Sequence, residues 1–586
     1  MRRKFTKALS LILSLLLTFT VAGSLTACNP DNGSGKTEIE ISGFDLGLGG
    51  TWFVDCTQRF EDKYADKEYA PGVKGVKVNI NEAVQSLANI QTDGNAIFIT
   101  GLDDTLAYHV QKGDFLNIND ILTEDLEMID GEMKSIADKI PEADRSMYQV
   151  NGEYYVAPEV EYYAATTYDR NLFNNEGLYL AKDTQGDKHE SNICKQNYYF
   201  VNGDATNKSC GPDGVFNTED DGLPSSLFEL AALCEYMKTR KTISPFAVSG
   251  EYKNYCNALF NALMVSLQGY TASDMFTLDS DGFEIITGWT NENLFPGIDY
   301  IKKPITETIP ITEETGYYTT WSADKYYAEA FVEMATKEGW WFSGTAMDTN
   351  SHTDAQADFI YSGYGANEKI GMLVEFSYWY NEATFSNSFD YFYSEYNYVT
   401  ERDIAFMPMP INLSETVAEG EGEKPSLIAV NNSYFIVNKN IEDDPALVEA
   451  VKDFMRFYFS ETELSRTTVD FGVAKRLNYS IKDEDKENFS DYCESMWNMR
   501  TNGNVVRIQG NTDTFRGNKG LFGRGFTDGA FGISGYRSCF SVIYDRTKTA
   551  KECFELQMID KDAWGSTYLK KAGATAGDYN GLVYSK

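Results

Sequence analysis

The stretch Gly-Met-Leu-Val-Glu-Phe-Ser-Tyr-Trp-Tyr-Asn-Glu-Ala, residues 371–383, joins an apolar run to a group of aromatic side chains. The apolar run, residues 371–374, is typical of a strand buried inside a sheet. In open α/β sheets, ligands collect beyond the carboxyl ends of the strands. Tyr and Trp offer a flat apolar face and a hydrogen-bonding tip, which match the face and rim of a sugar ring. We therefore expect Glu375, Tyr378 and Trp379 to bind a sugar, while for any single ring a place in the core is the alternative.

The chain before this stretch alternates strand and helix patterns. Residues 38–42, 76–80 and 96–100 read as strands, and helical patterns begin at Thr51 and near Leu106. This order favours an α/β fold with a mainly parallel sheet. The Gly-rich turn at residues 43–50 lacks the GxGxxG spacing of a nucleotide-binding loop. We expect it instead to bring Trp52 to the ligand cleft.

Two further segments carry candidate ligand-binding residues. Asn151-Gly152 predicts a hairpin turn, and Pro158 after it marks a crossing between domains. Glu159 and Tyr163 follow this crossing, and we expect them to face the ligand. Because neighbouring residues of a strand point to opposite faces, only one of Tyr162 and Tyr163 is expected to enter the cleft. The pair Trp340-Trp341, between Gly339 and Ser343, is a candidate stacking loop.

The chain begins with the features of a secretory signal. Four basic residues in the first seven precede an apolar run at residues 8–21, which is short for a membrane span. A polar, Gly- and Ser-containing stretch then follows Cys28 as a flexible tether. With 586 residues, the chain is too long for one core, so at least two domains are expected.

Charge and ligand inventory restrict the partners. The net charge is −37 and becomes −41 when the four bases of the signal are removed, which argues against nucleic acid or anionic lipid as a partner. The chain has nine Cys without CxxC spacing and three His, so we expect no metal site. Cys194 and Cys210 form the best local disulfide pair, with free buried thiols as an equal alternative. Residues 213–222 are rich in oxygen ligands, but their spacing is not that of an EF-hand, so an acidic turn is preferred over a calcium site.

An ordered set of segments resembles a known family. The set comprises Leu25-Thr26-Ala27-Cys28, which resembles a lipobox, and residues 371–383, 402–410, 431–439 and 471–479. In this order it resembles the extracellular solute-binding proteins (family 1) of bacterial carbohydrate ABC transporters, lipoprotein type. The aromatic pair of the family falls on Tyr378 and Trp379, with Phe376 in place of a Gly. Arg476 lies in the last segment, where Ala474 replaces a frequent Pro.

The resemblance implies a two-lobed α/β fold of the periplasmic-binding-protein type II, with mixed sheets, helices on both faces and a cleft between the lobes. It divides the chain into a signal peptide, a tether, an N-terminal lobe and a C-terminal lobe with an insertion at 181–222. The corresponding ranges are 1–27, 28–37, 38–157 with 402–460, and 158–401 with 461–586.

The function implied is that of a monomeric oligosaccharide-binding lipoprotein that delivers its ligand to an ABC transporter permease. It would be anchored through lipidated Cys28 on the extracytoplasmic face of the cell membrane, without catalysis or a cofactor. Three alternatives remain open: a lipid-anchored glycoside hydrolase, a surface polysaccharide-binding lipoprotein without transport, and a binder of peptides or anions.

Overall fold

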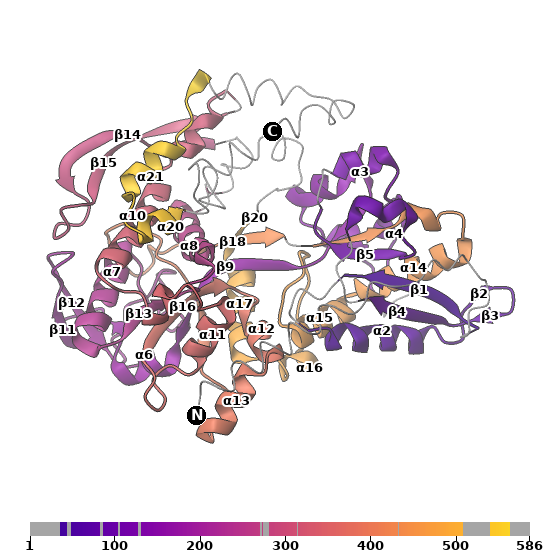
Figure 1. The fold of residues 1–586 in the computed structure, drawn as a ribbon, viewed down its shortest axis with the longest axis horizontal. Helices are drawn as coiled ribbons and strands as arrows, with labels where there is room; N and C mark the ends of the chain where they lie inside the picture. Colours follow the sequence, from indigo (N-terminus) through magenta and orange to yellow (C-terminus); the bar gives the residue numbers. More distant parts are fainter. Residues whose placement is uncertain are drawn as a thin grey trace.

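The computed structural model describes residues 35–43, 49–81, 86–102, 106–126, 131–269, 272, 280–312, 314–431, 433–507 and 539–562. The expectations for the signal peptide, for Cys28 and for most of the tether lie outside these residues. Figure 1 shows two lobes side by side, a smaller one on the right and a larger one on the left. Within the described residues, none of the helices combines the length and the apolar character that crossing a membrane requires.

The smaller lobe, lobe 1, is built on a five-stranded mixed sheet in the order β4-β1-β5-β19-β8. The strands are β1 (Thr37–Ser42), β4 (Val76–Asn81), β5 (Ile97–Thr100), β8 (Val156–Pro158) and β19 (Tyr434–Val437). The first three are parallel, as the strand and helix order predicts, while β19 runs antiparallel to both β5 and β8. Its helices are α2 (Thr51–Lys63), α3 (Leu106–Lys112), α4 (Asn119–Thr123), α5 (Ile136–Lys139), α14 (Pro445–Tyr458) and α15 (Glu461–Phe471).

The larger lobe, lobe 2, is built on a six-stranded mixed sheet. Its main order is β13-β16-β9-β18-β20, and β17 pairs with β9 outside this path. The strands are β9 (Glu161–Asp169), β13 (Ser244–Ala247), β16 (Ile370–Phe376), β17 (Ile404–Met407), β18 (Ser426–Asn431) and β20 (Asn504–Arg507). Strand β9 is antiparallel to its neighbours β16, β17 and β18, so the carboxyl ends of those three lie toward the start of β9. The helices are α6 (Arg170–Glu176), α7 (Leu227–Tyr236), α8 (Asn257–Gln268), α10 (Ala323–Lys337), α11 (His352–Ile360), α12 (Trp379–Phe385), α13 (Ser388–Tyr396), α17 (Asp491–Asn502), α20 (Cys539–Tyr544) and α21 (Ala550–Gln557). The short helix α16 (Asp483–Lys486) packs against α15 of lobe 1.

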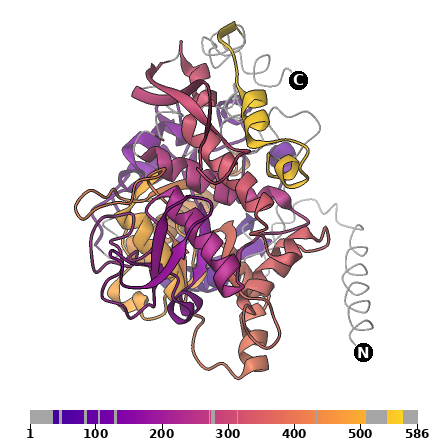
Figure 2. The same ribbon diagram turned by 90° about the vertical axis from the view of Figure 1, so that its left-hand side faces the viewer.

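Two small sheets extend lobe 2. The insertion at 181–222 contributes β11 (Asp187–Glu190) and β12 (Asn197–Val201), which form a three-stranded antiparallel sheet with β10 (Tyr179–Leu180). Strands β14 (Ser280–Asn293) and β15 (Lys302–Ile311) form a separate long ribbon. Figure 2 shows this ribbon at one end of the lobe and α13 projecting at the other end.

Short elements complete the fold. They are the strands β2 (Glu68–Ala70), β3 (Val73–Lys74), β6 (Gln149–Val150) and β7 (Glu153–Tyr154), and the helical turns η2 (Leu87–Thr92), η3 (Glu142–Tyr148), η4 (Met237–Lys241), η5 (Lys253–Cys256), η7 (Gly316–Trp321), η8 (Ser343–Ala346) and η9 (Lys439–Ile441). Strands β6 and β7 form the hairpin predicted from Asn151-Gly152, and both turn residues have the expected positive φ, 54° and 84°.

Three segments cross between the lobes. Strand β8 of lobe 1 leads through Glu159 into β9 of lobe 2, so the crossing predicted after Pro158 is present. The chain returns from β18 in lobe 2 to β19 in lobe 1. The third segment, residues 473–476, pairs with the first: Glu161 N donates to Ala474 O at 2.9 Å and Arg476 N donates to Glu159 O at 3.1 Å. The backbone at the junction is therefore hydrogen-bonded between segments that are distant in sequence.

The strand pairing corrects the expected domain boundaries. Residues 402–460 are expected in the first lobe, but β17 and β18, within 402–431, both pair with β9 in the sheet of lobe 2. Helix α15, expected in the second lobe, packs against α2 of lobe 1. The chain therefore returns to lobe 1 at β19 and leaves it again after α15.

Side chains alternate across the lobe 2 sheet between two cores. Ala405 and Met407 of β17 join the first core, which includes the apolar side chains of α8 and α10. Ile404 and Phe406 join the second core, which contains Trp379 and continues into the apolar side chains of lobe 1. This is the two-residue period of a strand that is buried on both faces.

Candidate functional site

The edge of the lobe 2 sheet that faces the crossing segments is where the sequence places a ligand site. Phe376, the last residue of β16, pairs with Ala164, and Asn431, the last residue of β18, pairs with Glu161. Both strands thus end beside the start of β9, three residues after β8 of lobe 1. Side chains that follow these strands lie at the junction of the lobes, outside the carboxyl ends of the strands.

Four aromatic side chains meet at this edge and form what we call the aromatic cluster: Tyr162, Tyr255, Phe376 and Tyr378. All four are half-buried. Tyr162 of β9 contacts Phe376 and Tyr378 edge-on, with ring centroids 5.4 and 5.1 Å apart. The rings of Phe376 and Tyr378 are nearly parallel at 6.0 Å. Tyr255, just before α8, contacts Phe376 edge-on with ring centroids 6.0 Å apart.

Carboxyl groups border the aromatic cluster. Gln356 of α11 donates to Glu375 Oε1 at 3.3 Å and to Glu382 Oε2 at 2.7 Å, and so connects the two. Glu375 is 3% exposed, and burial raises the pKa of its carboxyl well above the usual range. An unionised Glu375 can donate a hydrogen bond as well as accept one.

His352 links the acids to the rings. Its Nε2 lies 3.0 Å from Glu382 Oε1, and its ring stacks on Tyr255 with centroids 5.3 Å apart and an interplanar angle of 14°. The hydrogen bond to Glu382 raises the pKa of His352 above its usual value, although burial alone would lower it. The cluster therefore presents rings, hydroxyl groups and carboxyl groups together, the combination that a sugar hydroxyl rim and apolar ring face can use.

The structure brings two of the expected site residues, Tyr378 and Glu375, into this arrangement. The neighbouring Trp379 does not lie where a ligand contact was expected. Its indole is fully buried and donates Nε1–H to Thr167 Oγ1 at 2.8 Å in the second core. A side chain with no exposed face cannot stack on a ligand, so Trp379 serves packing. The helix α12 begins at this residue and turns the indole inward.

Trp340 and Trp341 are also core residues. They are 1% and 8% exposed and pack in the first core of lobe 2. Trp341 pairs with Phe246 of β13 in an isolated bridge, and its Nε1 donates to Thr336 Oγ1 at 3.1 Å. The expected stacking loop is thus an extension of the sheet edge, and neither indole is available to a ligand in this conformation.

Trp52, Glu159, Tyr163 and Arg476 lie buried near the crossing segments. Trp52 stacks on Phe471 at 4.4 Å. Glu159 pairs with Lys475 and accepts hydrogen bonds from Ser433 Oγ at 3.0 Å and Tyr458 Oη at 2.5 Å. These contacts are made within the protein, so the expected ligand contacts of Trp52 and Glu159 are corrected to structural ones.

Tyr163 and Arg476 are likewise held by contacts within the protein. Tyr163 Oη donates to Glu161 Oε2 at 3.0 Å, and Arg476 pairs with Asp144 at 3.4 Å. Of the two neighbouring tyrosines of β9, Tyr163 is buried and Tyr162 lies in the aromatic cluster. Sequence reasoning missed Tyr255, His352, Gln356 and Glu382, because only the fold brings them to the end of β16.

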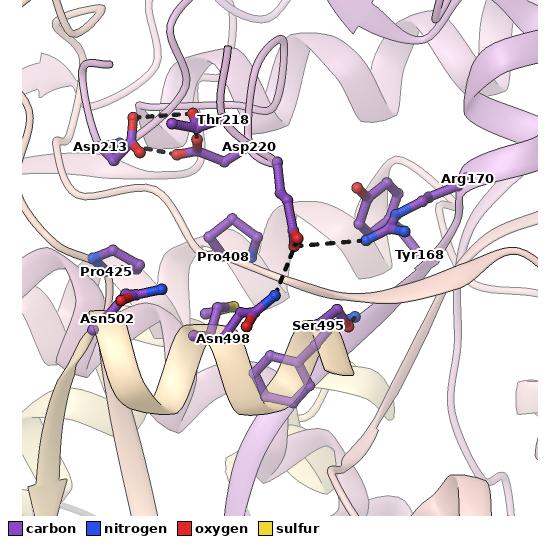
Figure 3. A pocket seen from close by; sticks show the side chains of 14 residues that line it. Tyr168, Arg170, Asp213, Thr218, Asp220, Pro408, Pro425, Ser495, Asn498 and Asn502 are labelled. Carbon is purple, nitrogen blue, oxygen red and sulfur yellow. Dashed lines mark hydrogen bonds and ion pairs between the residues drawn. The ribbon is translucent and has the colours of Figure 1, made fainter. Parts of the chain in front are cut away.

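A separate cavity of about 460 Å³ lies on the flank of lobe 2 (Figure 3). Tyr168 and Arg170 line it from the far end of β9, about 20 Å along the strand from Tyr162 at 3.3 Å per residue. Glu219 of the insertion reaches across it, 3.8 Å from Arg170 Nη2 and 3.1 Å from Asn498 Nδ2. This cavity is therefore distinct from the aromatic cluster.

The acidic turn at 213–222 borders that cavity. Asp213 Oδ1 accepts from Val215 N at 2.7 Å, and Asp220 Oδ1 accepts from Thr218 Oγ1 at 2.7 Å. Burial raises the pKa of Asp220 to about 6. Within the described residues, no group of three or more His, Cys, Asp or Glu is arranged to hold a metal ion. Cys194 and Cys210 are free thiols in the structure, each directed at a backbone carbonyl, of Phe228 and Val417 respectively.

No protein-family model and no curated protein sequence matches this chain. Solved structures match over most of its length. A chitin oligosaccharide binding protein superposes with a TM-score of 0.50 at 14% identity, covering 91% of this chain and 100% of that one. The apo form of RafE from Streptococcus pneumoniae superposes with a TM-score of 0.51 at 10% identity, covering 93% and 100%.

The chain has the two-lobed fold of bacterial solute-binding proteins. The expected fold class is thereby confirmed, while at such low identity the likeness speaks for the fold alone. Within this fold, the aromatic cluster lies at the edge of the lobe 2 sheet, next to the crossing segments.

Proposed function

We propose that this protein is a carbohydrate-binding lipoprotein that captures an oligosaccharide between its lobes and delivers it to an ABC transporter permease. The observation that carries the proposal is the aromatic cluster, bordered by Glu375 and Glu382, at the junction of the lobes. The chitin-oligosaccharide-binding protein of the same fold supports a sugar as the ligand class.

Capture needs no covalent chemistry. A sugar ring would lie with its apolar face against Tyr162 or Tyr378, while Glu382 and the tyrosine hydroxyls bind its hydroxyl groups. Micromolar affinity corresponds to about −8 kcal/mol, which two or three ring contacts and several hydrogen bonds can supply. Closure of the lobes about the crossing segments would then exclude water and form a new surface for the permease.

Binding is tested by calorimetric titration with xylo-, manno-, malto- and galacto-oligosaccharides. We expect at least one series to bind, and Tyr378→Ala to weaken that binding at least tenfold. Tyr318→Ala is the matched control, because Tyr318 is a partly buried tyrosine packed against the first core, away from the cluster. Unchanged affinity in Tyr378→Ala, or turnover of the sugar during the titration, would count against capture at this site.

The anchor is a separate part of the proposal. The lipobox-like Leu25-Thr26-Ala27-Cys28 supports lipidation of Cys28 and a location on the extracytoplasmic face of the cell membrane. Cys28→Ser should move the protein from the membrane fraction to the soluble fraction of cells that express the full chain. Retention of the variant in the membrane fraction would require another anchor.

A further inference from the structure

Three guanidinium groups converge on two carboxylates where the lobes meet. Arg507 Nε donates to Glu161 Oε1 at 2.7 Å, and Arg500 Nε lies 3.5 Å from Glu161 Oε2. Arg476 and Arg507 both place Nε 3.4 Å from Asp144 Oδ2. The three arginines come from the third crossing segment, α17 and β20, and the two acids from η3 and β9. We call these five residues the arginine cluster.

Within the described residues, the arginine cluster combines three guanidinium groups with two carboxylates, which leaves one positive charge in excess. The side chains of Arg476 and Arg500 are 0% and 6% exposed, and that of Arg507 is 17% exposed. Burial alone would raise the pKa of Glu161, but Arg507, Arg500 and Arg476 together lower it to about 2. Among the residues that the structure describes, Asp144 and Glu161 are the carboxylates paired with these arginines. An unpaired buried charge is costly, so a further anion would stabilise the cluster.

A cavity of about 590 Å³ adjoins this excess charge. Arg500 and Arg507 line it from lobe 2, and Lys134 and Glu461 line it from lobe 1. Arg500 Nη2 donates to the backbone carbonyls of Lys475 and Leu477 at 3.0 and 2.6 Å, and its Nε faces Glu161 without a hydrogen bond. Polar side chains complete the wall, among them Asn478 and Ser480. The cavity is therefore an open, hydrogen-bonding space lined by both lobes, with the arginines on its lobe 2 side and the Lys134–Glu461 ion pair, 3.3 Å apart, on its lobe 1 side.

This cavity is not the sugar site proposed above. Glu161 and Tyr162 are successive residues of β9, so their side chains point to opposite faces of the sheet. Tyr162 belongs to the aromatic cluster, while Glu161 belongs to the arginine cluster.

We propose that the cavity beside Arg500 and Arg507 is a second binding site, which takes an oxyanion of the carboxylate or phosphate class. The anion would accept hydrogen bonds from the guanidinium groups and supply the negative charge that the arginine cluster lacks. Lys134 would contribute from lobe 1, so the bound anion would contact both lobes. The source is either a free inorganic anion or the acidic group of a small molecule such as a uronic acid.

The test is calorimetric titration of the full protein at neutral pH and constant ionic strength with inorganic phosphate and with glucuronate. Glucose is the neutral control for glucuronate. We expect saturable binding of at least one of the two anions. Binding of phosphate alone would identify a free anion as the source, and binding of glucuronate alone would identify an acidic sugar.

Variants connect the binding to this cavity. Arg507→Gln should weaken the anion about tenfold and Lys134→Gln about threefold, because each removes one cation from the wall. Lys134 has an exposed side chain, 60% accessible, so its variant keeps the test valid even if Arg507→Gln fails to fold. Lys188→Gln, an exposed lysine of β11, is the matched control and should bind as the wild type does. Absence of saturable binding for both anions, or equal affinity in all variants, would overturn the proposal.

Discussion

Trp379 gives the sharpest test of how the protein packs next to the aromatic cluster. Its indole is fully buried, donates to Thr167 Oγ1 at 2.8 Å and contacts Phe359 and Tyr492 edge-on at 5.9 and 5.6 Å. Truncating a core Trp to Ala costs about 3–5 kcal/mol. Loss of the hydrogen bond to Thr167 adds about 1 kcal/mol. We therefore expect Trp379→Ala to lower the free energy of unfolding by about 4–6 kcal/mol.

The measurement is urea unfolding followed by far-UV circular dichroism, because the substitution removes a fluorophore. Trp379→Phe is the matched control. It keeps most of the ring volume and loses the hydrogen bond, so its cost should be about 1–2 kcal/mol. A Trp379→Ala protein within about 1 kcal/mol of the wild type that no longer binds sugar would refute the packing role. That pair of results would mean that the indole faces a ligand.

Three further predictions concern the junction and the insertion. Glu161→Gln should cost about 3–5 kcal/mol in urea unfolding, since it leaves the arginines with Asp144 alone. The pKa of Glu161 is lowered to about 2, so its stabilising contribution is complete above pH of about 4.3 and is lost as the pH falls toward 2. The difference in unfolding free energy between wild type and Glu161→Gln should therefore become smaller over that pH range. A difference that does not change with pH would contradict this account. Gly422→Ala should lower the melting temperature, at a cost of about 1–3 kcal/mol, because the added Cβ would overlap the backbone of Asp213 and Gly214. Gly94→Ala is the control, because Gly94 has open space around it. Equal melting temperatures for the two variants would refute the clash. EDTA should leave the melting temperature unchanged, since Asp213 and Asp220 accept hydrogen bonds from the protein; a large drop would indicate a bound cation.

Local signals in the sequence predicted the elements well. Residues 38–42, 76–80 and 96–100 lie in the expected strands to within a residue, and Thr51 and Leu106 begin the expected helices. Ser226 and Glu229 form a capping box with both hydrogen bonds, as their spacing predicts. Each of these signals depends on neighbours within a few residues, so the sequence alone contains the information.

The side-chain environment was harder to predict. The two-residue period of a strand predicts that Tyr162 and Tyr163 point to opposite faces, but not which of them faces a ligand. In the structure Tyr163 is fully buried and Tyr162 is half-buried. At Trp379, a helix that starts at the same residue rotates the indole into the core. Packing between distant segments decides which face of a helix or strand meets the other lobe. A single sequence does not contain that information.

The position of the candidate site was therefore easier to predict than its residues. The end of β16 was expected from the apolar run at 371–374, and Tyr378 and Glu375 are found there. Tyr255 and His352 come from segments about 120 and 25 residues earlier, and their stacking at 5.3 Å depends on the fold. Ser351 caps the helix that begins at His352, but this local signal does not indicate which residue His352 contacts.

The second core passes without interruption from the lobe 2 sheet into lobe 1. Neither lobe can melt without stripping apolar surface from the other, so heating in a scanning calorimeter should give one cooperative peak and not two. For the same reason, either lobe expressed by itself would expose part of that core to water and aggregate, so this chain must be produced and handled whole.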